Sequence, residues 1–212
     1  MNKKFFYGMS IMAMMFATTS CGGEETTEET TEEVKSVEYT IDTEGSVINW
    51  WNMEGEEKGH TGTVSVLEGT YTVEGDVITA ASMVVDMQSI TADSDKLVGH
   101  LTMTDHFFSV MRPDTVSADS VNWVEDNTTA TFTFDKHENG MIYGSVNVND
   151  LDFAVEAPVT LTEGKIEIGE FSIDMSGLTY FVMEVANVEV PEEERHDPNI
   201  GFSATIVGKS AE

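Results

Sequence analysis

The sequence LDFAVEAPVTLTEGKIEIGEFSIDM, residues 151–175, decides the fold class of this 212-residue chain. Apolar residues occupy every second position from Leu151 to Leu161, and the residues between them are mostly polar, which predicts a strand with one buried face. Glu163-Gly164-Lys165 is a turn signal between this run and a second alternating run. In the second run the apolar phase slips by one residue beside Gly169, as it does at a β-bulge that lets a long strand bend. The segment therefore predicts two antiparallel strands in a sheet that curls.

The same period of two dominates the chain from about Val37 almost to its end. One such run predicts a single buried face that carries Val77, Ala81, Met83, Val85 and Met87. The pair Asn139-Gly140, between two further runs, is the strongest short hairpin signal in the sequence. Roughly eight strands with short connections and almost no helix predict an antiparallel barrel or sandwich, and closure into a barrel would remove the exposed strand edges.

Residues 93–110 are the one interruption of this pattern. The spacing of apolar residues there, from Leu97 and Leu101 to Phe107 and Phe108, predicts one or two short helices. Asp105 is a candidate cap for the second helix. We expect this helical insertion to cover an opening or one wall of the sheet.

The first 20 residues are typical of a secretory signal peptide. Lys3 and Lys4 precede an apolar stretch of about 13 residues, which is too short to span a bilayer as a helix. Cys21 follows small residues, as the lipidated cysteine of a bacterial lipoprotein does, so we expect a lipid anchor at this residue. An ordinary secreted protein with a free thiol is the alternative.

An acidic segment separates this anchor from the folded domain. Residues 22–33 contain no apolar side chain that could be buried, so we expect residues 21–35 to form a disordered tether. Residues 36–212 are then the folded β-domain. The predicted location is the cell envelope, either in the periplasm or on the outer-membrane surface.

The charge of the chain excludes one large class of partners. The chain carries 39 Asp and Glu residues against 10 Lys and Arg residues, a formal net charge of -29. Binding to nucleic acid is excluded, because affinity for phosphate backbones comes from clustered Lys and Arg. Direct contact with anionic membranes is disfavoured for the same reason, so the N-terminal lipid anchor is the only membrane attachment that we expect.

The sequence lacks the usual signatures of catalysis and metal binding. A single cysteine excludes an internal disulfide and a thiolate zinc cage. No Gly-x-Ser-x-Gly elbow, His-Glu-x-x-His helix or phosphate-binding glycine loop is present. Residues 135–140 begin like a calcium loop, but Val146 stands where the bidentate Glu is required. We therefore expect no enzymatic activity, no metal and no resident cofactor.

Several motifs together resemble the YceI family. They are Tyr39-Thr40-Ile41-Asp42, Gly59-His60-Thr61-Gly62, Asp86-Met87-Gln88-Ser89-Ile90, Lys96-Leu97-Val98-Gly99-His100-Leu101 and Asp105-His106-Phe107-Phe108-Ser109-Val110. The resemblance covers about residues 36–209 and implies an all-β fold, a lipocalin-like antiparallel eight-stranded barrel with one short helical insertion. It also implies that the chain, as a lipoprotein member of the family, holds a polyisoprenoid or another long amphiphile inside the barrel.

An eight-stranded barrel either fills with its own side chains or holds one small ligand. Methionines among the inward-facing residues are adaptable, polarizable liners suited to a flexible chain. The alternative, that the same residues pack a closed core, stays open. The candidate ligand-binding residues, in the lumen or at its mouth, are Trp50, His60, Met83, Val85, Met87, Leu97, His100, Leu101, Phe107, Phe108, Phe132, Phe134, Phe153, Phe171 and Ile173. His60 and His100 are the two expected nearest a headgroup, with a structural histidine bonded to backbone as the alternative.

The resulting hypothesis is a lipid- or polyisoprenoid-binding lipoprotein of the cell envelope. It would carry or sequester a long-chain amphiphile, such as an isoprenoid, a quinone or a fatty amide, in an apolar lumen. The alternative from a different class is a ligand-free acidic β-module that mediates protein–protein contacts at the cell surface. Whether the chain forms a homodimer is left open.

Overall fold

Strands account for most of the residues that the computed structural model describes, which are 34–54, 57–102, 111–113, 121–123, 127–186 and 191–210. The strands are β1 (Ser36–Ile41), β2 (Val47–Glu54), β3 (Glu57–Glu74), β4 (Val77–Asp86), β5 (Met111–Pro113), β6 (Val121–Trp123), β7 (Thr129–Glu138), β8 (Met141–Val148), β9 (Leu151–Thr162), β10 (Lys165–Asp174) and β11 (Asn199–Ser210). The helices are α1 (Asp95–Thr102) and α2 (Thr179–Ala186), with 3₁₀ turns at Met87–Ser89 and Glu192–Glu194. The predicted signal peptide, Cys21 and most of the predicted tether lie outside the described residues, as do Phe107 and Phe108.

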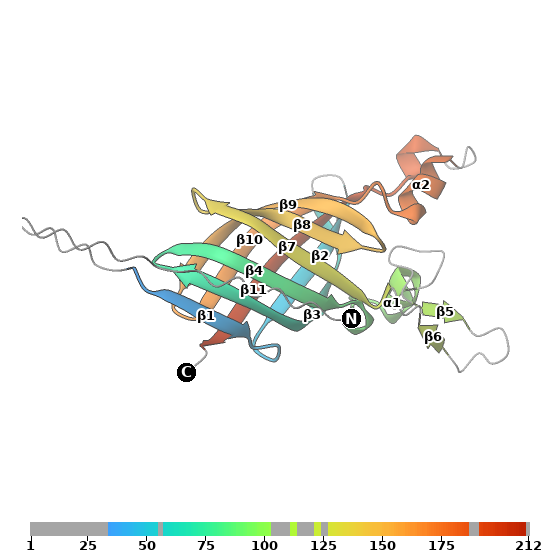
Figure 1. Ribbon diagram of the computed structural model, residues 1–212. Coiled ribbons are helices and arrows are strands. Elements are labelled where there is room, and N and C mark those ends of the chain that lie inside the picture. Colours follow the sequence, from blue (N-terminus) through green and yellow to red (C-terminus); the bar gives the residue numbers. More distant parts are fainter. Residues whose placement is uncertain are drawn as a thin grey trace, which may run out of the picture. The chain divides into compact units, whose positions relative to one another are not determined.

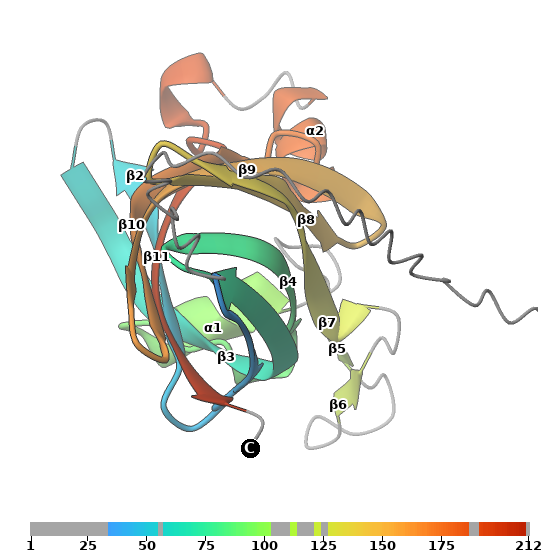
Figure 2. The same ribbon diagram turned by 60° about the vertical axis from the view of Figure 1, so that its left-hand side comes forward.

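The main sheet closes on itself as an antiparallel barrel. The order β11-β10-β9-β8-β7-β4-β3-β2 joins neighbouring strands, and β2 pairs back with β11, for example at Ala204 and Ile48. Figures 1 and 2 show the sheet curling around an interior. The predicted eight-stranded barrel is confirmed, and the sandwich alternative is excluded.

One position of the barrel is shared by two consecutive strands. Both β1 and β2 pair antiparallel with β3 and β11, with β1 nearer the end at which β3 finishes. Between them, the backbone N–H of Asp42 donates to the carbonyl of Val207 at 2.7 Å, and the Ser46 hydroxyl accepts from the Val207 N–H at 2.9 Å. The Ser46 side chain thus replaces a backbone partner where the strand breaks, so the barrel stays closed across the gap.

The hairpin that decided the fold class forms as predicted, except that Leu151, the first residue of the predicted buried face, is 37% exposed. Every second residue of β9 from Phe153 to Val159 is buried, and its neighbours between them are exposed. The pairing of β10 with β11 shifts register between Ile168 and Phe171, which confirms the bulge beside Gly169. These features bend a long strand around the barrel.

The predicted buried face of β4 is wrong at its first residue. Val77 is 45% exposed, whereas Ile78 is 3% exposed and faces the interior. The reason is a register shift opposite Thr72 and Val73, where β4 carries one extra residue. Such a bulge moves the side chains before it to the opposite face of the sheet. A prediction that assumes a strict period of two along the whole strand misses this change.

Two short helices lie at the barrel end opposite to β1 and the C-terminus (Figure 1). α1 confirms the predicted helical insertion, and the N–H groups of Leu97 and Val98 both donate to the Ser94 carbonyl at its start. α2, in the connection between β10 and β11, was not predicted from the sequence. Leu178, just before this helix, and Phe181 within it are buried in the hydrophobic core. None of the helices within the described ranges is long and apolar enough to cross a membrane.

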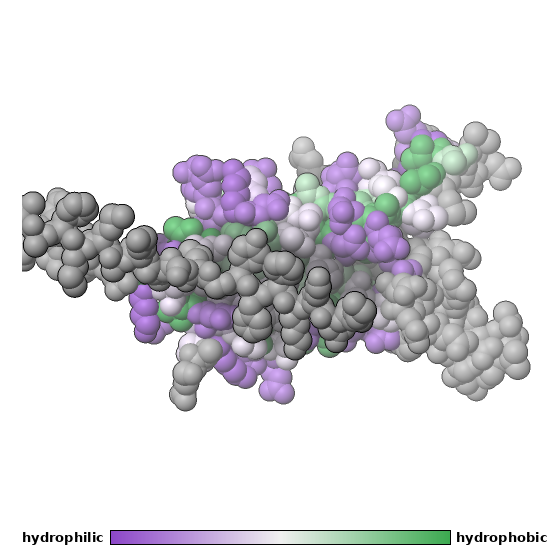
Figure 3. Space-filling model, in the orientation of Figure 1, coloured by the Kyte–Doolittle hydropathy of each residue, from purple (hydrophilic) through white to green (hydrophobic). Residues whose placement is uncertain are grey.

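The outer surface separates into polar and apolar areas. Figure 3 shows polar side chains over the strands and an apolar area over α2. Val182 and Val185 are the exposed large apolar residues of that helix. The strand faces carry ion pairs, such as Lys136 Nζ with Glu138 Oε2 at 2.7 Å, and this pairing holds the pKa of the Glu138 carboxyl below its usual range.

Candidate ligand-binding site

The barrel interior contains a cavity of about 110 Å³. It is lined by Ile48, Trp50, Val64, Met83, Val85, Met87, Ile90, Ala130, Phe132, Ile142, Val146, Val148, Val155, Ile168, Phe171, Ile173, Met175, Phe202 and Ala204. All of these side chains are apolar except for the indole nitrogen of Trp50. That nitrogen donates to the Thr91 carbonyl at 3.0 Å, so its hydrogen-bonding capacity is already used. The site can therefore recognise a ligand only through shape and apolar contact.

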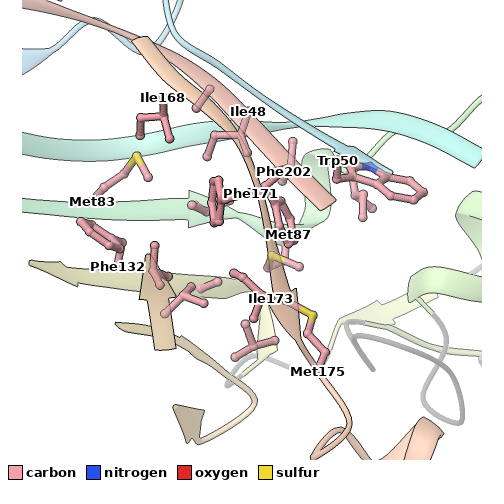
Figure 4. A pocket seen from close by; sticks show the side chains of 18 of the residues that line it. Ile48, Trp50, Met83, Met87, Phe132, Ile168, Phe171, Ile173, Met175 and Phe202 are labelled. Atoms are coloured by element: carbon pink, nitrogen blue, oxygen red, sulfur yellow. The ribbon is translucent and has the colours of Figure 1, made fainter. Parts of the chain in front are cut away.

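The cavity exists because inward-facing side chains do not all meet across the barrel. Figure 4 shows the lining residues surrounding an open space. The rings of Phe171 on β10 and Phe202 on β11 pack side by side with centroids 5.8 Å apart, and neither side chain is fully buried. Met83 and Phe132 are also only partly buried although they point inward. This residual exposure is what an incompletely filled interior predicts.

A second, smaller chamber of about 40 Å³ lies among the same strands. Its lining includes Ile41, Tyr71, Ile78, Phe134 and Ile206. The Tyr71 ring stacks on the Tyr39 ring with centroids 4.9 Å apart and an interplanar angle of 15°. Burial, reinforced by Tyr39, raises the pKa of Tyr71 to about 12, because the charged phenolate is disfavoured away from water.

A loop segment docks beside the larger cavity and supplies Ile90 to its lining. The N–H of Thr91 donates to the Thr63 carbonyl at 2.8 Å, and the N–H of Asp93 donates to the Thr61 carbonyl at 2.9 Å. His60 Nδ1 lies 2.9 Å from Asp93 Oδ1 on the outside of β3. In this arrangement His60 fastens the loop to β3, and about half of its side chain is exposed to solvent.

The structure gathers part of the predicted site around the larger cavity. These residues are Trp50, Met83, Val85, Met87, Phe132, Phe171 and Ile173. Phe134 lines the smaller chamber instead.

The remaining predicted site residues lie elsewhere. Phe153 is buried and faces Gly177 rather than either chamber. Leu97 and Leu101 on α1 pack into the hydrophobic core. His100 lies on α1, but its side chain is outside the described part of the structure, and Phe107 and Phe108 are outside it altogether.

Several lining residues escaped the sequence prediction. The most informative are Ile48 on β2 with Phe202 and Ala204 on β11, which face the cavity from the seam where the barrel closes. A signal for the β11 pair was present, because Ile200, Phe202, Ala204 and Ile206 alternate with the period of two.

The electrostatics of the site are simple. Among the residues that the structure describes, no acidic or basic side chain lines the larger cavity. Within the described ranges, no group of three or more His, Cys, Asp or Glu residues is arranged to hold a metal ion. Such a lining offers a ligand only the free energy of removing apolar surface from water.

Comparisons with known proteins relate the chain to one family. The family model described as YceI-like domain matches residues 39–194. A polyisoprenoid-binding domain from Saccharophagus degradans, implicated in plant cell wall breakdown, is similar in structure, with a TM-score of 0.52 and 11% sequence identity over 82% of this chain and 99% of that one. BcnA from Burkholderia cenocepacia matches with a TM-score of 0.49 and 12% identity over 80% of this chain and 99% of that one. A search of curated proteins found no match. The family match spans most of the barrel, and the chain therefore belongs to the YceI-like domain family.

Proposed function

We propose that this protein binds a long-chain amphiphile by enclosing its apolar chain in the barrel lumen. The observation that carries the proposal is the lining of the larger cavity, in which the described residues are apolar and none is titratable. The barrel shared with the polyisoprenoid-binding domain of Saccharophagus degradans supports an isoprenoid as the ligand class. A quinone or a fatty amide would meet the same apolar requirement.

Burial of apolar surface is a sufficient driving force. Each methylene transferred from water into the lumen contributes about 0.8 kcal/mol, so several isoprene units suffice for tight binding without a charged contact. The headgroup would then lie outside the apolar part of the site. The proposal requires no reaction, so the chain acts as a carrier or a store for its ligand.

The cavity must adapt to hold a long chain. Its volume of about 110 Å³ is below the ~300–1,000 Å³ of sites that enclose drug-sized ligands. Met83, Met87 and Met175 line it, and unbranched methionines change rotamer more readily than branched side chains. Entry of a chain therefore proceeds with rearrangement of these three residues.

The proposed setting is the cell envelope. A lipid on Cys21 would attach the domain to a membrane through the acidic segment that follows it. Amphiphiles with long apolar chains partition into membranes, so a tethered barrel would exchange them over short distances.

Metabolic labelling with a fatty-acid analogue, compared between the wild type and Cys21→Ser, tests the anchor separately from ligand binding.

Native mass spectrometry of freshly purified protein tests the binding function, with organic extraction to identify any bound compound. We expect an adduct of an apolar compound in the wild type and in Ala154→Leu, whose residue lies on the exposed face of β9. Ala204→Leu places extra volume in the cavity and should lose the adduct while remaining folded by circular dichroism.

An unliganded wild type that also takes up no added geranylgeraniol would reject lumen binding. That result would leave the ligand-free acidic β-module as the remaining hypothesis.

A further inference from the structure

The two interior chambers are separated by a shared layer of side chains. Met83 on β4, Phe132 on β7, Ile142 on β8 and Ile168 on β10 line both the larger cavity and the smaller chamber. We call these four residues the waist. In Figure 4, Met83, Phe132 and Ile168 lie together at one end of the larger cavity, opposite to Trp50 and Met175.

Three members of the waist are held in place. Phe132 lies over Gly144 on β8, where a Cβ atom would come within 2.9 Å of the Phe132 ring, so the absence of a side chain there makes the seat for the ring. Ile142 is almost fully buried. Ile142 and Ile168 are β-branched, and β-branched side chains are restricted at χ1.

Met83 is the movable member. It pairs directly with Phe132 across β4 and β7, and on its other side it faces Gly69 of β3, where the Ile41 side chain lies in the space that a Cβ atom of Gly69 would take. Phe132 and Ile168 are partly buried as Met83 is, but Met83 is the one member of the waist whose side chain has three rotatable bonds and no branch. A change of rotamer at Met83 therefore alters the passage between the chambers without moving the backbone.

The smaller chamber ends against an aromatic pair. Tyr71 is 2% exposed, and its hydroxyl lies in the space that a Cβ atom of Gly208 on β11 would take. Tyr39 stacks on its ring, and Ile41 contributes to the same lining. A chain that passes the waist thus enters a compartment with a mainly apolar lining.

We propose that the smaller chamber is a terminal subsite for the distal end of the bound chain and that Met83 controls entry to it. This inference rests on the proposed function. A short chain occupies only the larger cavity, whereas a longer chain must turn Met83 aside to place its last carbons beyond the waist. The waist therefore makes the protein selective for chain length.

The test is a comparison of farnesol, geranylgeraniol and solanesol as ligands, each titrated against delipidated protein by quenching of tryptophan fluorescence. Met83→Ala joins the chambers and should raise affinity for the longer alcohols relative to farnesol by up to about tenfold, the equivalent of releasing one strained rotamer. Ala81→Leu fills the smaller chamber alone and should lower the same ratio while farnesol still binds.

Met87→Ala is the matched control, because Met87 lines the larger cavity but not the smaller chamber. It should change affinity for all three alcohols by a similar factor. An unchanged ratio of long-chain to short-chain affinity in both Met83→Ala and Ala81→Leu would overturn the role of the waist in chain-length selectivity. Binding in the larger cavity would be unaffected by that result. Failure of the wild type to bind any of the three alcohols would instead overturn the function on which the inference rests.

Discussion

At the scale of single residues, Tyr71 fills one end of the barrel interior at the cost of burying its hydroxyl without a hydrogen bond to any described residue. Its hydroxyl is buried and has no hydrogen-bond partner among the described residues, while its ring fills one end of the interior. A buried hydroxyl without a partner costs about 1–3 kcal/mol. The packing of the ring against Tyr39 must offset that cost.

Tyr71→Phe keeps the ring and removes the unpaired hydroxyl. We expect the free energy of unfolding at pH 7, measured in urea, to stay the same or to rise by up to about 1 kcal/mol. A clear loss of stability would show that the hydroxyl has a partner in solution, such as a trapped water.

The pH dependence of this variant has a definite sign. Burial raises the pKa of Tyr71 to about 12 from 10.0, so the unfolded chain loses the phenolic proton at lower pH than the folded chain does. The contribution of protonated Tyr71 to the free energy of unfolding is therefore complete below pH 10. It falls between pH 10 and 12, by at most ~1.4 kcal/mol per pH unit. Tyr71→Phe lacks this loss, so its stability relative to the wild type should increase over that range. A constant difference from pH 9 to 12 would contradict the assignment.

At the scale of elements, tight turns set the register of the strands. In the hairpin between β7 and β8, Asn139 has φ 55° and Gly140 has φ 72°. Both residues are in the left-handed region, as the primed turns of two-residue hairpins require. The turn pairs Glu138 with Met141 and so determines which β8 residues face the interior.

Gly140→Ala should therefore lower the free energy of unfolding by about 1–2 kcal/mol, the usual cost of a Cβ atom in left-handed backbone. Gly177→Ala is the matched control. Gly177 has no positive φ, and the nearest atom that a new methyl group would meet is Phe153 Cε1 at 3.7 Å. Equal losses in the two variants, measured by urea unfolding, would contradict the role of the turn.

At the scale of the whole molecule, closure of the sheet creates both the stability and the site. Closure pairs β2 with β11 and leaves the main barrel without a free edge along that seam. It also places apolar residues from eight strands around one volume that they do not completely fill. Stability and binding are therefore linked, because a ligand in the lumen supplies contacts that the empty barrel lacks.

Loading the lumen should raise the stability of the domain. At a free ligand concentration of 100 times Kd, the expected gain is about 2.7 kcal/mol. Differential scanning calorimetry of delipidated protein, with and without geranylgeraniol, measures this gain as a higher Tm. Ala204→Leu should show no comparable rise. A wild-type Tm that does not respond to the ligand would argue against lumen binding.

The sequence by itself determined the strand pattern, the main hairpins and the apolar character of the interior. Local rules were sufficient for these features, because a period of two assigns alternate faces and Asn139-Gly140 prescribes a turn. The bulge beside Gly169 was visible for the same reason, as a slip of one residue in an otherwise regular pattern. The pattern predicted roughly eight strands in a barrel or a sandwich, and the resemblance to a known family favoured the barrel.

Only the tertiary structure decided which inward residues surround empty space. Phe153 was a reasonable site candidate by its position on β9, yet it packs beneath the turn before α2. Phe202 and Ala204 were not among the predicted site residues, yet they line the cavity at the seam between β11 and β2. The physical reason is that a cavity is the difference between the volume that a closed sheet encloses and the volume of the side chains that enter it. That difference depends on strand register and bulges across the whole barrel, which no local segment of sequence specifies.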